Sequence, residues 1–205
     1  MTTNPSITFA IPYYRGVDYL RRAIASVQAQ TRDDWECVVV DDAGPESAAA
    51  AVLALGDPRV RYERNAENLG LGGNWNRCLA LATAPLVTLL HADDELRPGY
   101  ADAVIRAHAA HPDATAVYTR AIVIGPDGDP VFSFPDRVKR VVEGRTSGAT
   151  VVTGEPGLER LLRGQFIFCP TLCYRRAALG PDPFSTSWRM VLDLDLLAST
   201  LLDGR

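Results

Sequence analysis

Residues 86–95 read LVTLLHADDE, an apolar run that passes directly into adjacent acids. An apolar run this short, with Pro98 and Gly99 soon after it, is typical of a strand buried on both faces, as in a parallel sheet. The acids would then stand at the carboxyl end of that strand, where open α/β sheets bind their ligands. Adjacent carboxylates at such an edge are costly unless a positive group meets them. The stretch therefore predicts a cation site, and our working hypothesis is a divalent metal carrying a nucleotide diphosphate.

Strand and helix patterns alternate on both sides of this stretch. Short apolar runs alternate with segments in which apolar residues recur every three or four positions, the period of a helix. We expect strands at 7–11, 35–40, 59–63, 86–90, 114–125 and 166–174, and helices at 17–27, 46–55, 75–82, 98–108, 155–162 and 194–201, with a glycine- and asparagine-rich loop at 65–73. This alternation predicts an α/β fold, a Rossmann-like and mostly parallel sheet with helices on both faces.

Length and composition limit the domain organisation and the partners. A chain of 205 residues suffices for a single domain, 1–205, with a sizeable core. The polar segment 136–148 inside it is typical of a mobile loop or lid. A net charge of −4 gives no reason to expect a nucleic-acid partner.

The apolar runs and the cysteines bear on the compartment. No apolar run approaches the roughly 20 residues that span a bilayer, and the polar N-terminus does not resemble a signal peptide. Four cysteines are too few for a disulfide framework. We therefore expect a cytoplasmic protein without a transmembrane segment, and peripheral association with the inner face of the membrane stays open.

Acid pairs follow two of the predicted strands. Asp41 and Asp42 close the second strand as Asp93 and Asp94 close the fourth, while Pro12-Tyr13-Tyr14 (residues 12–14) closes the first. The carboxyl ends of parallel strands share one edge of a sheet, so these groups can converge although they are far apart in the chain. Any single acid pair is also explained by a solvated loop or a helix cap. Their coincidence at successive strand ends favours a site.

Five short motifs in order resemble a family 2 glycosyltransferase of the GT-A fold. They are IPYY at 11–14, SVQAQT at 26–31, WECVVVDD at 35–42, NLG at 68–70 continuing to Asn76, and HADD at 91–94. The resemblance is close over 6–110 and loose over the remainder. It implies a nucleotide-sugar-binding half at 6–110 and a C-terminal acceptor-binding half at 111–205.

The resemblance also implies the donor and its site. Such enzymes use a nucleotide-diphosphate sugar and usually Mg²⁺ or Mn²⁺. Pro12 and Tyr14 would line the nucleoside pocket, and Asp42 would accept a hydrogen bond from the base. Asp93 would reach the ribose and Asp94 would ligate the metal. A hard cation of this kind is held well by one carboxylate together with substrate phosphates and water.

Three further residues keep alternative interpretations. Asn76 matches an asparagine of the family pattern that would bind the donor or order the loop before it. His91 stands where the family often has another aspartate; it could support the acids or approach the donor, but a packed neutral histidine closing the strand is the simpler interpretation. His108, near the end of a predicted helix, is interpreted as a surface residue.

The family places a general base near the start of a late helix, about where residues 190–197 read MVLDLDLL. A base is needed because the acceptor hydroxyl must lose its proton. At about 100° per residue, Asp193 lies about 75° from the centre of the leucine face and Asp195 about 125° from it, toward solvent. Asp193 is therefore the better candidate, although both acids would also suit a helix N-terminus. Leu192 stands where the family often has an acid, which leaves the register open.

The resemblance predicts an inverting, metal-dependent and non-processive sugar transfer to an acceptor hydroxyl. The acceptor could be a glycan, a lipid-linked molecule or a small molecule. A processive synthase would carry downstream motifs and transmembrane helices that we do not find. One alternative is a nucleotide-sugar-binding domain that is non-catalytic or truncated, since many relatives extend further at the C-terminus. A nucleotidyltransferase ranks lower, because no glycine- and basic-rich loop follows the first strand.

Overall fold

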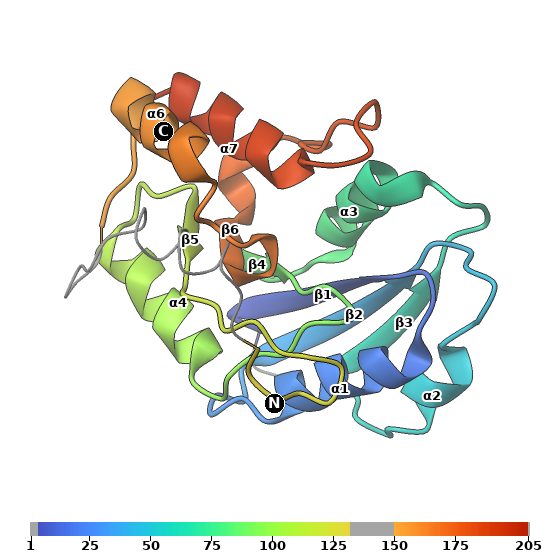
Figure 1. Cartoon of the computed structure of the whole chain (residues 1–205). Coiled ribbons are helices and arrows are strands. Elements are labelled where there is room, and N and C mark those ends of the chain that lie inside the picture. Colours follow the sequence, from blue (N-terminus) through green and yellow to red (C-terminus); the bar gives the residue numbers. More distant parts are fainter. Residues whose placement is uncertain (1–3, 132–149, 205) are drawn as a thin grey trace.

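The computed structural model describes residues 4–131 and 150–204 and contains a six-stranded sheet in the order β3-β2-β1-β4-β6-β5 (Figure 1). The first four strands in this order are parallel, and β6 runs antiparallel to both β4 and β5. The strands are β1 (Ile7–Tyr13), β2 (Trp35–Asp41), β3 (Val60–Arg64), β4 (Leu86–Leu89), β5 (Ala116–Tyr118) and β6 (Leu172–Arg175). The mostly parallel α/β sheet that the sequence predicts is confirmed.

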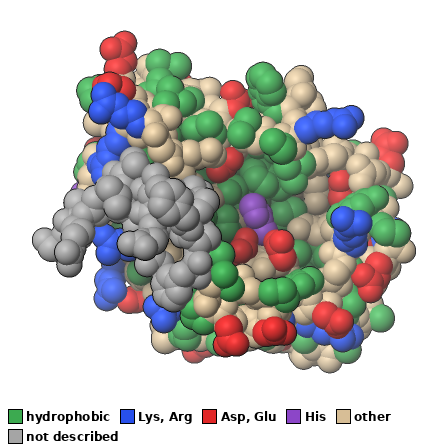
Figure 2. Space-filling model, viewed as in Figure 1, with side chains coloured by type: hydrophobic (Ala, Val, Ile, Leu, Met, Phe, Trp, Pro, Cys, Tyr) green, Lys and Arg blue, Asp and Glu red, His purple; other side chains and the backbone are tan. Residues whose placement is uncertain are grey.

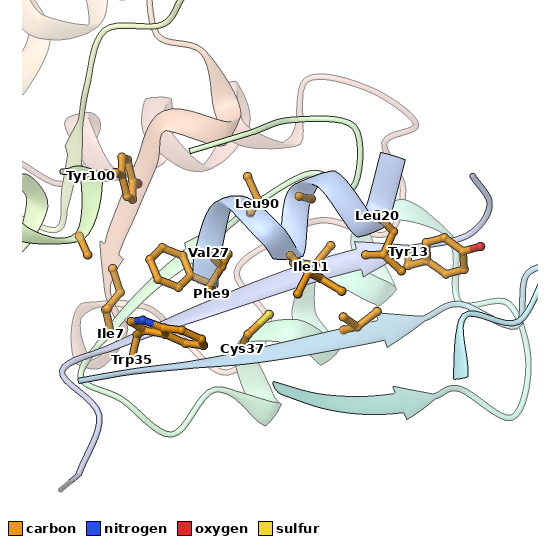
Figure 3. Packing of buried hydrophobic residues seen from close by; sticks show 14 of the residues in the cluster. Ile7, Phe9, Ile11, Tyr13, Leu20, Val27, Trp35, Cys37, Leu90 and Tyr100 are labelled. Carbon is orange, nitrogen blue, oxygen red and sulfur yellow. The ribbon is translucent and has the colours of Figure 1, made fainter. Parts of the chain in front are cut away.

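Helices cover both faces of the sheet. They are α1 (Val17–Gln28), α2 (Ala49–Leu53), α3 (Gly70–Leu81), α4 (Tyr100–Ala110), α6 (Gly154–Gly164) and α7 (Leu192–Leu202). Buried side chains of α1, α2 and α4 form one core with the sheet, and those of α3, α6 and α7 form the other. Figure 3 shows Phe9 and Ile11 of β1 directed toward α1. Ala10, between them, belongs to the opposite core, as the two-residue period of a strand requires.

Pro12 lies within β1 although proline is rare inside a central strand. The carbonyl of Ala10 accepts the amide of Leu90 from the β4 side, whereas the carbonyl of Tyr13 accepts that of Asp42 from the β2 side. Pro12 has the parity of Ala10 and so faces the side on which β4 has already ended. Its missing N–H therefore interrupts no ladder bond, and β1 continues two residues beyond the predicted end.

The strand order reverses between β1 and β4. From β1 the chain builds outward through β2 to β3, and it then returns to place β4 on the other side of β1. In open α/β sheets the crevice outside the carboxyl ends at such a reversal is the usual place for a ligand. The topology therefore singles out residues 12–14 and the acids after β4.

Several predicted elements have different bounds in the structure. The helix α3 begins at Gly70, inside the stretch predicted as a loop, and α2 covers only part of 46–55. The strands predicted at 114–125 and 166–174 shrink to β5 and β6. The other apolar residues of these two segments lie in irregular backbone. They are not part of strands because β5 pairs with β6 alone and over only three residues. The predicted lid, 136–148, lies outside the described residues.

His108 was wrongly predicted to be a surface residue. Its side chain is buried, and its Nε2 lies 3.0 Å from the carbonyl oxygen of Cys173 on β6. Arg175 approaches the other ring nitrogen at 3.3 Å. The helix period places His108 on the inward face with Ala101 and Val104, so a polar partner on β6 makes its burial tolerable.

An arginine–carboxylate pair just before β2, which Ser6 links to the start of β1, should make stability depend on pH. Arg32 donates to both oxygens of Asp34 at 2.8 and 2.7 Å, and Ser6 also donates to Asp34. These bonds, that of Arg32 first, lower the pKa of Asp34 to about 2. The stabilisation is complete above the unfolded pKa near 4 and should be lost as the pH falls toward 2. Thermal unfolding between pH 5 and 2 should show a shallower decline for Asp34→Asn, whereas Asp18→Asn, at an exposed ion pair, should follow the wild type.

Candidate nucleotide-sugar site

A cleft of about 1130 Å³ opens at the carboxyl ends of the parallel strands. Figure 2 shows a hollow there, with a histidine side chain at its floor and carboxylates beside it. Of the seven predicted site residues, five line the cleft: Pro12, Tyr14, Asp42, Asp93 and Asp193. Asp94 is not among the lining residues, but its carboxylate lies within 4.8 Å of the ligand atoms of His91 and Asp93, which are lining residues. Asn76 does not line the cleft. The fold thus brings together groups as far apart in the chain as Pro12 and Asp193, which are 181 positions apart.

The acids after β2 have different partners although they are adjacent. Asp41 is fully buried, accepts the amide of Gly44 at 3.0 Å, and is bonded through its other oxygen to Tyr62 and Arg64. Its bonding capacity is committed to the turn after β2 and to β3. Gly44 is required in this turn, because a Cβ there would lie 1.7 Å from the carbonyl oxygen of Tyr14. Asp41 is therefore a structural residue.

Asp42 is oriented toward the cleft by the loop after β3. Its Oδ1 accepts the side-chain amide of Asn65 at 2.9 Å and the backbone amide of Leu69 at 2.8 Å. Asn65 also donates to Asn74, whose own amide donates to the carbonyl of Val40. Of the two carboxylate oxygens of Asp42, only Oδ1 takes part in hydrogen bonds within the described part of the chain. The second oxygen is thus positioned for a donor group on a ligand.

His91, Asp93 and Asp94 form a cluster whose ligand atoms all lie within 4.8 Å of one another. Nδ1 of His91 lies 3.5 Å from Oδ2 of Asp94, too far for a hydrogen bond. Burial and then the charge of Asp93 raise the pKa of Asp94 to about 6. Burial lowers the pKa of His91, against the opposing influence of Asp93 and Asp193. At neutral pH Asp94 is therefore mostly ionised and the imidazole of His91 is neutral.

A divalent cation fits this cluster. The oxygens of Asp93 and Asp94 are the ligands that Mg²⁺ and Mn²⁺ prefer, and a neutral imidazole can coordinate as well. The raised pKa of Asp94 shows a carboxylate poorly compensated by the described residues. A positive charge at this point would favour its ionised form.

The start of α7 supplies the third acid. Asp193 lines the cleft, whereas Asp195, on the next part of the turn, does not. Leu192 is buried in the core formed with α3 and α6. Asp193, the next residue along α7, is thus attached to a helix end that is anchored in the core. Both acids are half-buried, and of the two only Asp193 lines the cleft.

Asn76 makes both of its side-chain bonds to one backbone unit. Its Nδ2 donates to the carbonyl of Phe184 at 2.8 Å, and its Oδ1 accepts the amide of Phe184 at 3.0 Å. Phe184 lies edge-on to Trp75 with centroids 5.0 Å apart, and Trp75 lies 5.3 Å from the ring of His91. Asn76 therefore holds Phe184 against Trp75, which lines the cleft, although Asn76 itself is not a lining residue.

Asn76→Ala should destabilise the fold. The substitution leaves two buried backbone groups of Phe184 without partners, which costs about 2 kcal/mol or more. Urea unfolding should show this loss of unfolding free energy, and Asn4→Ala, at an exposed position, should show almost none. An Asn76→Ala protein as stable as the wild type would mean that Phe184 finds other partners.

The sequence analysis did not predict several residues that line or shape the cleft, some of which come from segments distant in the chain. Residues 124–126 line it, held by Arg22, which donates to the carbonyl of Pro126 at 2.6 Å and pairs with Glu95. Gly72 allows α3 to approach the segment at 185–186, since a Cβ would lie 2.5 Å from the carbonyl oxygen of Ser185. Arg15 and Trp75 line the cleft beside predicted residues. In the sequence, only the proximity of Arg15 and Trp75 to the motifs could have indicated that they line the cleft.

A second cavity lies away from the acids. It measures about 680 Å³ and is bounded by residues of α4, β5, β6, α6 and α7 and of the connecting segments 111–115 and 150–153. Among the described residues, no helix is long and apolar enough to cross a membrane.

Solved structures resemble this chain over most of its length. Crystal structures of TarS from S. aureus include one of residues 1–349 that superposes with a TM-score of 0.71 at 20% identity, over 95% of this chain and 55% of that one. The mannosyltransferase PcManGT from Pyrobaculum calidifontis, in complex with GDP-Man and Mn²⁺, gives a TM-score of 0.56 at 23% identity over 86% of this chain and 46% of that one. Both are GT-A-type glycosyltransferases, so the fold is the GT-A fold.

Sequence comparison gives the family. The sequence model of Glycosyl transferase family 2 matches residues 8–152, more than half of the chain. The chain therefore belongs to glycosyl transferase family 2. The succinoglycan biosynthesis protein ExoO of Rhizobium meliloti is 38% identical over 94 residues, which cover 46% of this chain and 27% of ExoO. The chain thus spans much less than two thirds of the length of this relative.

Proposed function

We propose that this chain transfers a sugar from a nucleotide-diphosphate donor to an acceptor hydroxyl, with inversion at the anomeric carbon and one sugar per encounter. The observation that carries the proposal is the convergence of Asp42, the cluster around Asp94, and Asp193 in one cleft at the strand-order reversal. These groups suit the three needs of such a reaction: a base-recognition contact, a site for the cation that would offset the charge of a diphosphate, and a proton acceptor.

The donor is held along the edge of β1, β2 and β4. Pro12 and the exposed ring of Tyr14 flank the nucleoside, and the second oxygen of Asp42 accepts an N–H of the base. Asp93 reaches the ribose. Asp94, with Asp93 beside it, would hold Mg²⁺ or Mn²⁺. When bound, that ion offsets the negative charge that develops on the departing diphosphate.

Asp193 acts as the general base. Its carboxylate takes the proton of the acceptor hydroxyl as the acceptor oxygen forms its bond to the anomeric carbon. The bond from that carbon to the diphosphate oxygen breaks with its electron pair, which leaves with the nucleotide. Attack on the face opposite the leaving group inverts the configuration. The acceptor is a glycan, a lipid-linked molecule or a small molecule that reaches Asp193 from the α7 side of the cleft.

A nucleotide panel followed by a turnover assay tests the proposal. Thermal shifts with UDP, GDP, ADP, CDP and dTDP, each with and without Mn²⁺, should show one nucleotide stabilising the protein most, and more so with metal. The corresponding nucleotide sugars should then be hydrolysed slowly or transferred when Mn²⁺ is present. A protein that binds a nucleotide but never turns over a sugar would be a binding domain. A protein that no nucleotide stabilises would contradict the proposal altogether.

A further inference from the structure

His91 is the member of the acidic cluster that the proposed function leaves without a role. It follows β4 directly, lines the cleft, and has a side chain only 29% exposed. Its Nδ1 lies 3.5 Å from Oδ2 of Asp94, and its Nε2 is buried with no hydrogen-bond partner among the described residues. A histidine that only filled space would more usually place a ring nitrogen on a protein partner.

The spacing of the cluster suits coordination better than hydrogen bonding. Two ligands at about 2.1 Å from one ion, as oxygen and imidazole nitrogen commonly are, lie about 3 Å apart when adjacent and about 4 Å apart when opposite. The separation of 3.5 Å between His91 and Asp94 falls within that range, and the limit of 4.8 Å for the whole cluster requires only a small contraction.

Ring packing, in place of a second hydrogen bond, sets the orientation of His91. Its ring lies against Trp75 at 32° and 5.3 Å, and Trp75 is fixed edge-on by Phe184 at 5.0 Å. Phe184 in turn is held through its backbone by Asn76. Most metal-bound histidines are oriented by a hydrogen bond from the other nitrogen. Here packing on Trp75 orients the ring, and Nε2 has no such partner among the described residues.

We infer that Nδ1 of His91 is a nitrogen ligand to the cation that Asp93 and Asp94 hold, and that it shifts the preference of the site from Mg²⁺ toward Mn²⁺ and Co²⁺. The inference rests on the proposed function, which supplies the cation. Imidazole binds Co²⁺ and other later divalent metals well, whereas Mg²⁺ prefers oxygen ligands and keeps its waters. A site with two carboxylates and one imidazole should therefore favour Mn²⁺ and Co²⁺ over Mg²⁺ more strongly than a site of carboxylates alone.

Electron spin-echo spectroscopy of bound Mn²⁺ tests the ligand directly. Mn²⁺ is added to the protein alone, then with UDP and with GDP, using protein labelled with ¹⁵N at histidine and unlabelled protein. A nitrogen coupling that changes with the histidine label is expected. It should vanish in His91→Asn and persist in His111→Asn, the matched control at the end of α4. The labelled wild type needs no substitution, so poor folding of a variant cannot obscure the result.

Metal selectivity gives a second readout. Titration with Mg²⁺ and with Co²⁺ should show that His91→Asp lowers the ratio of the Mg²⁺ to the Co²⁺ dissociation constant by roughly tenfold or more. An unchanged ratio, or bound Mn²⁺ without histidine coupling, would overturn the role of His91 and leave the proposed function intact. Failure of Mn²⁺ to bind under any of these conditions would overturn both this inference and the metal dependence.

Discussion

Asp94→Asn is expected to abolish metal-dependent turnover and, in the absence of metal, to make the folded protein more stable. The first effect follows from loss of the carboxylate placed at the centre of the cluster with His91 and Asp93. The second follows from its environment. Burial and the charge of Asp93 raise the pKa of Asp94 from 3.8 to about 6. Sites that bind charged ligands commonly reduce the stability of the free protein in this way.

The sign of the stability effect can be checked by pH. Because the folded pKa of Asp94 is above the unfolded value, its contribution to stability is complete below pH 4 and is lost as the pH rises through 6. In EDTA, Asp94→Asn should therefore melt a few degrees above the wild type near pH 7, and the difference should vanish near pH 4.

Calorimetric titration of Mn²⁺ in the presence of the preferred nucleotide should show metal binding by the wild type and none by Asp94→Asn. Asp113→Asn, at an exposed loop position, is the control and should change neither property. Metal-stimulated turnover by Asp94→Asn would place the metal elsewhere.

Asp193→Asn should lower kcat by about 10²- to 10⁴-fold, the usual contribution of a general base, while the affinity for donor and metal stays near that of the wild type. The amide has the shape of the carboxylate but cannot accept the hydroxyl proton. Single-turnover rates with the preferred nucleotide sugar and calorimetric titration of the nucleotide separate the two quantities.

Asp195→Asn is the matched control for this experiment, since it lies on the same helix but does not line the cleft. It should transfer sugar at nearly the wild-type rate. The opposite outcome, an active Asp193→Asn and an inactive Asp195→Asn, would exchange the roles of the two acids. Equal loss of donor affinity and rate in Asp193→Asn would indicate a binding contact in place of a base.

The distribution of apolar residues was enough to predict the fold class. Short apolar runs separated by helical periods leave few arrangements other than a covered parallel sheet. The acids at 41–42 and 93–94 could be placed at one edge for the same reason, because parallel strands end together. Strand bounds near the C-terminus could not be predicted, since whether an apolar segment pairs depends on a neighbouring strand.

Within the site, the sequence determined which residue types stand at the strand ends, and only the tertiary structure decided what each one does. Asp41 and Asp42 are equivalent in a sequence, yet one is enclosed by Arg64 and Tyr62 while the other faces the cleft. Asn76 matches a family position, but its hydrogen bonds go to Phe184. Hydrogen-bond partners, burial and the approach of distant segments are set by packing between elements, which local sequence patterns do not encode.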